Sequence, residues 1–139
     1  MDGYFFEDLS LGQSASFGKT ITEADILLFA GVSGDTNPVH INAEVAAASM
    51  FKERIAHGML SASLISTVLG TRLPGAGTIY LGQNLKFRAP VKIGETVTAT
   101  VTVTALDAAK KRVTLSTVCT VAGKPVIDGE ATVMVPSRG

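Results

Sequence analysis

Hydrophobic and polar residues alternate along most of the second half of the chain. Residues 96–103 alternate threonine with valine or alanine, which is typical of a strand with one buried face. Similar patterns at residues 78–88, 112–122 and 126–135 predict three more strands, with a turn at residues 123–125. Strands at this spacing, joined by short turns, favour an antiparallel meander.

Residues 57–73 have a different pattern, with apolar side chains on nearly every side of a helical axis. A helix of this kind is buried. The gaps are filled by small residues such as Ser61, Ser63 and Ser66, which let other backbone approach closely. A sheet with one apolar face needs a cover, and this helix can supply it. We therefore predict an α+β fold, in which a curved antiparallel β-sheet wraps around a long central α-helix.

The first half of the chain predicts two shorter helices separated by a loop. Thr22, followed by acidic residues, is a good N-cap, and Gly31 and Gly34 are expected to mark the end of the first helix. The loop spans residues 35–40, and three consecutive alanines suggest a second helix at about residues 43–49.

Composition narrows the possible functions. The 139 residues are the size of one domain, 1–139, and 46% of them are hydrophobic. Twelve basic residues balance twelve acidic ones, so we expect neither a nucleic-acid nor a membrane partner. We expect no membrane span, because no apolar run approaches about 18 residues, and no signal peptide, because the first residues lack a basic segment. A cytoplasmic protein is expected, with the single Cys119 as a small buried hydrophobe.

Asp35 and His40 are the strongest candidates for chemistry. They place a carboxylate and an imidazole five positions apart in a segment stiffened by Pro38, and Gly58 then opens the central helix. A carboxylate and an imidazole can transfer protons beside a carbonyl that is polarised by a helix N-terminus. An aspartate and a histidine in a polar loop can also serve only as turn and cap residues, and this alternative stays open here.

Residues 33–40, Ser-Gly-Asp-Thr-Asn-Pro-Val-His, resemble the hydratase signature of the MaoC-like dehydratases, the family of (R)-specific enoyl-CoA hydratases. Residues 56–60, 80–83 and 87–95 resemble the start of that family's central helix and two of its sheet segments. The resemblance covers the chain from residue 12 to about residue 135. It implies a hot-dog fold, a homodimer, and reversible syn hydration of trans-2-enoyl-CoA to (R)-3-hydroxyacyl-CoA.

The resemblance also implies roles for single residues. Asp35 and His40 would hold and activate one water, the backbone N–H of Gly58 would stabilise the negative charge on the thioester oxygen, and Ser66 matches the family's active-site serine. Which of the acid/base pair takes the first proton is left open, because the two would titrate as a unit.

A tunnel for the acyl chain is expected between the central helix and the sheet. The residues that we expect to contact the substrate are Asn37, His57, Met59, Leu64, Ile65 and Leu69. Within this set Asn37 would organise the loop, and His57 would hold the loop and the helix start together. No cofactor is expected, since coenzyme A is part of the acyl-CoA substrate. No metal is expected either, because two histidines without clustered carboxylates are poor zinc ligands.

Two other functions remain possible on the same scaffold. One is an acyl-CoA thioesterase, since a fold does not settle function. Hot-dog thioesterases usually carry their carboxylate on the central helix, where this chain has Ser61, Ser63 and Ser66, so the position of Asp35 and His40 argues against it. The other is a non-catalytic acyl-CoA-binding subunit, which the intact signature disfavours.

Overall fold

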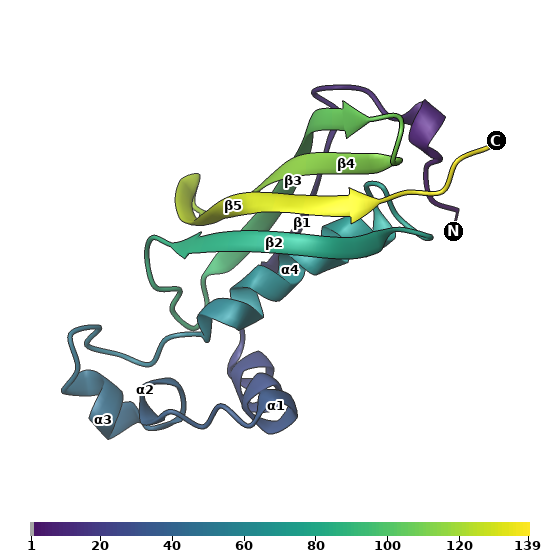
Figure 1. Cartoon of the computed structure of the whole chain (residues 1–139). Helices are drawn as coiled ribbons and strands as arrows, with labels where there is room; N and C mark the ends of the chain where they lie inside the picture. Colours follow the sequence, from purple (N-terminus) through teal and green to yellow (C-terminus); the bar gives the residue numbers. More distant parts are fainter. Residues whose placement is uncertain (1) are drawn as a thin grey trace.

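A computed structural model describes residues 2–139 of the chain. Five strands form one antiparallel sheet in the order β1-β3-β4-β5-β2, and helix α4 lies along one face of it (Figure 1). The strands are β1 (Ser14–Thr20), β2 (Ile79–Phe87), β3 (Thr96–Asp107), β4 (Arg112–Val121) and β5 (Lys124–Met134). The helices are the 3-10 helix η1 (Phe6–Asp8), α1 (Glu23–Ser33), α2 (Pro38–Ile41), α3 (Ala43–Ala47) and α4 (Gly58–Thr71).

The core lies between α4 and the sheet. Strand β3 alternates buried and partly exposed residues as its sequence predicts, and it contacts α4. The inner face of β3 consists of small and branched side chains, namely Val97, Ala99, Val101 and Val103. Helix α4 packs Leu64, Ile65, Val68 and Leu69 into the same cluster. The predicted α+β arrangement is therefore confirmed.

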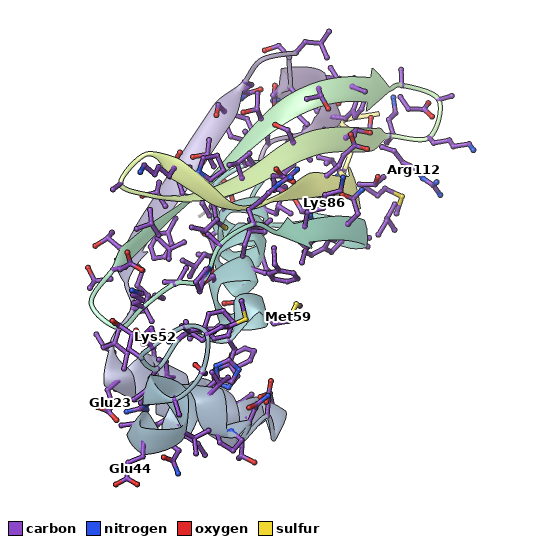
Figure 2. The ribbon with its side chains drawn as sticks, turned by 90° about the vertical axis from the view of Figure 1, so that its left-hand side faces the viewer. Glu23, Glu44, Lys52, Met59, Lys86 and Arg112 are labelled. Carbon is purple, nitrogen blue, oxygen red and sulfur yellow. The ribbon has the colours of Figure 1, made fainter. Side chains whose placement is uncertain are left out.

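Helices α1, α2 and α3 lie beyond one end of the sheet, and we call residues 23–53 the overhang (Figure 1). In Figure 2, Glu23 and Glu44 lie at the outer end of the overhang, Arg112 lies toward the far end of the sheet, and Met59 lies between them. The segment with the acid/base residues is thus outside the sandwich of helix and sheet, at its open end.

The overhang differs from the prediction in two places. Helix α1 runs through Gly31 and ends at Ser33, and Gly34 caps it in the left-handed conformation with φ of 79°. His40 lies on the short helix α2 and not on a loop. Pro38 occupies the first turn of α2 with Asn37 as its cap, a position where proline starts a helix and does not block one.

The connections between strands also refine the predicted meander. Strands β3, β4 and β5 form it, but β2 precedes β3 in the chain and pairs with β5 at the sheet edge. The β4–β5 turn consists of Ala122 and Gly123, with φ of 51° and 80°, so Lys124 and Pro125 already belong to β5. Two successive residues with positive φ give the tight turn that suits a twisted hairpin.

Cys119 is fully buried on β4, as expected for a small apolar residue. Burial raises the pKa of its thiol to about 11, so the thiol is protonated at neutral pH. Among residues 2–139, no helix is both long and apolar enough to cross a membrane.

Candidate active site

The connection between α1 and α2 positions Asp35. The Ser33 hydroxyl oxygen accepts a hydrogen bond from the Asp35 backbone N–H at 3.1 Å. One Asp35 carboxylate oxygen accepts the backbone N–H of Asn37 at 3.2 Å, which closes a local turn. This turn uses one of the two carboxylate oxygens, and the other remains for a ligand.

His40 is held on α2 with a defined tautomer. The side-chain oxygen of Asn37 caps α2 by accepting the Val39 N–H at 3.2 Å. Nδ1 of His40 lies 2.8 Å from the carbonyl oxygen of Ile55. Because a carbonyl oxygen only accepts, Nδ1 carries the hydrogen, and Nε2 of the neutral ring is an acceptor.

His57, the N-cap residue of α4, packs directly on His40. The two rings are stacked with their centroids 3.9 Å apart, and the ring centroids of Phe29 and His57 are 4.8 Å apart. Nε2 of His57 donates to the backbone carbonyl of Asp35 at 2.9 Å. His57 therefore joins the Asp35 turn to the start of α4, which is the role expected for it. Its Nδ1 is buried and has no partner among the described residues.

The side chains of Asp35, His40 and His57 converge. One nitrogen or carboxylate oxygen from each lies within 4.8 Å of the others, and all three residues line a cavity of about 590 Å³ that we call the catalytic cavity. With the tautomers above, the groups left for a ligand are all acceptors. They are therefore suited to a ligand that donates protons, such as a water molecule.

The same three residues are the candidates for holding a metal ion. A metal lies close to the plane of each imidazole that binds it. The rings of His40 and His57 are stacked, with an angle of only 26° between their planes. A single ion therefore cannot lie close to both rings and in the plane of each. This arrangement fits proton transfer better than coordination.

Gly58 brings a helix N-terminus to the catalytic cavity. It is the first residue of α4, so the helix offers no acceptor for its N–H, and the positive end of the helix dipole lies there. A Cβ at this position would lie 2.6 Å from Cε1 and 2.8 Å from Cδ1 of Phe87. Glycine is therefore needed for the ring of Phe87 to lie against the helix start.

The family match agrees with this geometry. The model of the MaoC like domain family matches residues 9–129, which include the acid/base pair and the whole of α4. The chain belongs to this MaoC-like family.

Named relatives and solved structures extend the match. The MaoC-like chain is 68% identical over 136 residues to an (R)-specific enoyl-CoA hydratase of Rhodospirillum rubrum, covering 98% of this chain and 94% of that protein. The structure of R-hydratase PhaJ1 from Pseudomonas aeruginosa superposes with a TM-score of 0.93 and 49% identity, over 98% of this chain and 88% of that one.

A second solved structure is the (R)-hydratase from Aeromonas caviae involved in PHA biosynthesis, with a TM-score of 0.91, 45% identity and coverage of 94% and 99%. With these structural neighbours, the α+β architecture of the MaoC-like chain is the hot-dog fold.

Ser66 lies apart from the acid/base pair within this MaoC-like chain. It is exposed and lines a second cavity of about 550 Å³ between α4 and β2, together with Tyr80 and Gln83. Met59 lines both cavities and so lies between them. The structure brings Asp35, His40 and Gly58 together, but it does not bring Ser66 into the same cavity.

The second cavity lies between α4 and the sheet, where the acyl tunnel was expected, but three of the predicted residues do not line it. Leu64, Ile65 and Leu69 are buried in the core against the sheet and line neither of the two cavities. Because α4 is apolar on nearly every side, its sequence does not show which side faces the sheet. The residues predicted for the tunnel turned out to lie on the side that packs against the sheet. Asn37 is exposed and uses its amide oxygen to cap α2, so it organises the segment as expected.

Several residues of the catalytic cavity were not expected from the sequence. The carbonyl of Ile55 fixes the His40 tautomer, and Phe87 covers Gly58. Ser61 lines the catalytic cavity with a buried hydroxyl that has no partner among residues 2–139. A backbone carbonyl leaves no signal in a sequence, and Ser61 resembled the other serines of the helix.

Proposed function

We propose that this protein catalyses the reversible (R)-specific hydration of trans-2-enoyl-CoA, with Asp35 and His40 activating one water. The convergence of Asp35, His40 and the N-terminus of α4 on one cavity carries the proposal. The 68% identical relative from Rhodospirillum rubrum bears the name of this activity, and a relative in Methylorubrum extorquens, 46% identical, is named 3-hydroxybutyryl-CoA dehydratase. Both names describe addition of water to, or its removal from, an acyl-CoA.

The proposed step needs one water held between the two side chains. Its oxygen bonds to C3 of the enoyl group as one of its protons passes to the pair, and the pair delivers a proton to C2 on the same face. The net result is syn addition of H and OH. Nε2 of His40 is the acceptor that the Ile55 contact leaves free, and the second carboxylate oxygen of Asp35 is the other.

Electron density moves toward the thioester oxygen as the C3–O bond forms. The N–H of Gly58, at the positive end of the α4 dipole, would donate to that oxygen. The role of Ser66 as an active-site serine stays a prediction. The proposed step uses the two side chains, the Gly58 N–H and one water, and coenzyme A enters as part of the substrate. A cytoplasmic location is part of the proposal.

The decisive experiment follows the loss of enoyl absorbance when crotonyl-CoA is added, together with an assay for free thiol and chiral analysis of the product. We expect (R)-3-hydroxybutyryl-CoA without thiol release. The variants Asp35→Asn and His40→Gln should each lower kcat/KM by about 100-fold or more, because one acid/base group contributes about 10²–10⁴-fold.

Asp107→Asn is a matched control. Asp107 also accepts backbone N–H groups in a turn, but it does so in the β3–β4 hairpin, outside both cavities. Its activity should equal that of the wild type. Near wild-type rates in Asp35→Asn or His40→Gln would refute the assignment. Thiol release from saturated acyl-CoA would indicate a thioesterase, and stabilisation by acyl-CoA without turnover would indicate a binding subunit.

We also propose that two copies of the chain form a homodimer. Strand β2 is at the edge of the sheet and exposes a row of large apolar side chains, which are Ile79, Tyr80, Leu81 and Phe87. An apolar edge strand is a template for pairing with another strand. Met59 on α4 is 56% exposed at the second cavity, next to this edge.

A further inference from the structure

Residues 54 and 55 hold α2 at three points. The Arg54 Nε donates to the backbone carbonyl of His40 at 2.7 Å, and the N–H of Ile55 donates to the carbonyl of Val39 at 3.3 Å. The carbonyl of Ile55 accepts from Nδ1 of His40. The two contacts of Ile55 use only its backbone. The contact from Arg54 is therefore the one that depends on the identity of a side chain outside α2.

Arg54 is itself anchored at its other end. Its Nη1 donates to the carboxylate of Glu23 at 2.6 Å, and Glu23 is the first residue of α1. The Arg54 side chain is only 13% exposed, whereas Glu23 is 58% exposed. A guanidinium has five N–H donors in a rigid fork, so it can join a carboxylate on one side to a carbonyl on the other.

Helix α2 needs such support because it has only four residues. A helix of this length is not stable by itself, and its last carbonyls have no donors within the helix. The carbonyls of Val39 and His40 are two of these, and they are satisfied by Ile55 and Arg54. The position of the His40 ring therefore depends on contacts from outside α2.

We propose that Arg54 is a positioning residue for the acid/base pair. Braced by Glu23, its guanidinium fixes the carbonyl of His40 and thereby holds the imidazole opposite Asp35. This inference rests on the proposed function, since it assigns Arg54 to the same site. Arg54 itself does not touch the reacting atoms; it acts through His40.

The test compares three variants in the full-length protein. Arg54→Gln should lower kcat by about 10- to 100-fold, because a misplacement of about 1 Å can cost about 100-fold in rate. KM should stay within about twofold, since the interaction that is lost does not hold the substrate. Arg54→Lys should recover part of the rate, because an ammonium is a single point charge that cannot span both partners as a fork does.

Glu23→Gln keeps the contact with His40 but weakens its anchor, so its rate should fall between those of Arg54→Gln and the wild type. Arg112→Gln is the control, since Arg112 lies in the β3–β4 hairpin, far from the overhang (Figure 2), and forms no ion pair among residues 2–139. It should leave kcat and KM unchanged.

A second measurement tests positioning without any assay of activity. The chain has only two histidines, so nitrogen NMR of the imidazoles can be assigned with His40→Gln. The wild type should show a hydrogen on Nδ1 of His40 and on Nε2 of His57. In Arg54→Gln the His40 signals should broaden or show tautomer exchange, while Arg112→Gln should leave them as in the wild type.

Unchanged kcat together with unchanged His40 signals in Arg54→Gln would overturn the proposal. Should Arg54→Gln fail to fold, wild-type rates and His40 signals in both Arg54→Lys and Glu23→Gln would overturn it equally. A wild-type protein that hydrates no enoyl-CoA would refute the proposed function, whereas the NMR comparison would still decide whether Arg54 holds His40.

Discussion

A single backbone carbonyl determines how His40 can act. The carbonyl of Ile55 accepts from Nδ1, and this leaves Nε2 as the acceptor of a neutral imidazole. The stacked ring of His57 and its bond to the Asp35 carbonyl keep the two segments together. The proposed acid/base pair is therefore oriented by groups that have no part in the proposed proton transfer.

Gly58 offers a sharp test at the same scale. In Gly58→Ala the new methyl group would overlap the edge of the Phe87 ring and obstruct the approach of a carbonyl to the helix N-terminus. We expect kcat/KM to fall by about 100-fold, as for the loss of one donor to an oxyanion. Steady-state kinetics with crotonyl-CoA would measure this.

Gly31→Ala provides the matched control, because a Cβ at Gly31 in α1 would meet no atom within 4 Å. This variant should keep its activity and gain about 0.5–1 kcal/mol in the free energy of unfolding, since alanine is the better helix former. Equal kinetics in the two variants would contradict the need for glycine at the start of α4.

The sequence was informative about residues whose role is local. Asp35, His40 and Gly58 were predicted because a turn, a short spacing and a helix start are visible in the sequence, and because residues 33–40 resemble the hydratase signature of the MaoC-like dehydratases. The environments of Ser66, Leu64, Ile65 and Leu69 depend on which side of α4 faces the sheet. That orientation follows from tertiary packing, so it could not be inferred from the residues alone.

At the scale of elements, α1 begins with a reciprocal cap. The Thr22 hydroxyl accepts the N–H of Asp25 at 3.2 Å, and the Asp25 carboxylate accepts the N–H of Thr22 at 2.8 Å. The same carboxylate lies 2.9 Å from the Lys19 ammonium at the end of β1. Hydrogen bonding from Lys19, and then from the Thr22 backbone, holds the pKa of Asp25 below its ordinary value.

Asp25→Asn should therefore destabilise the protein in a pH-dependent way. A lowered pKa in the folded state means that the ionised carboxylate stabilises the fold. This contribution is fully present above the ordinary carboxyl pKa of 3.8 and is lost as pH falls through the lowered value. At pH 7 we expect a loss of about 0.3–1 kcal/mol in the free energy of unfolding, measured by urea denaturation.

The difference from the wild type should shrink as the pH falls below about 3.8. Glu130→Gln is the control, because the exposed carboxylate of Glu130 on β5 forms no ion pair within the described part of the chain. A destabilisation that is independent of pH would contradict the role given to the Asp25 charge.

Elements with a strong internal pattern were predicted well. The alternation in β3 and β4 and the cap at Thr22 each depend on neighbouring residues only. Helix α2 was missed because residues 35–40 were predicted to be one loop, although proline in the first turn after an asparagine cap is a start signal. The β4–β5 turn predicted at residues 123–125 includes Gly123 but misses Ala122, and its last two residues belong to β5.

At the scale of the whole molecule, the sheet has two edge strands within residues 2–139, β1 and β2, and β2 is the edge that exposes large apolar side chains. The order of strands across the sheet could not be predicted from the sequence in full. Tight turns give the neighbours of β4, but β1 and β2 reach the edges through pairs that are distant in the chain. The exposure of β2 follows from this order.

The proposed homodimer can be tested at this edge. The wild type should have twice the chain mass of 14.4 kDa in light scattering at micromolar concentration. Leu81→Lys should shift the mass toward that of one chain, because a lysine on an edge strand opposes pairing.

Leu11→Lys is the control, since Leu11 is 66% exposed in the turn before β1, at the opposite side of the sheet. It should keep the dimer. A wild-type protein with the mass of a single chain would contradict the proposal.

The overhang determines how the enzyme would lose activity on heating. It holds Asp35 and His40 through a few contacts, whereas the sheet and α4 share a continuous core. Regions with few buried contacts open locally at a lower free energy than the core does. Heating should therefore abolish catalysis before the sheet and α4 unfold. A more heat-resistant enzyme would come from substitutions that stabilise residues 35–55, because a more stable sheet would not protect the segment that unfolds first.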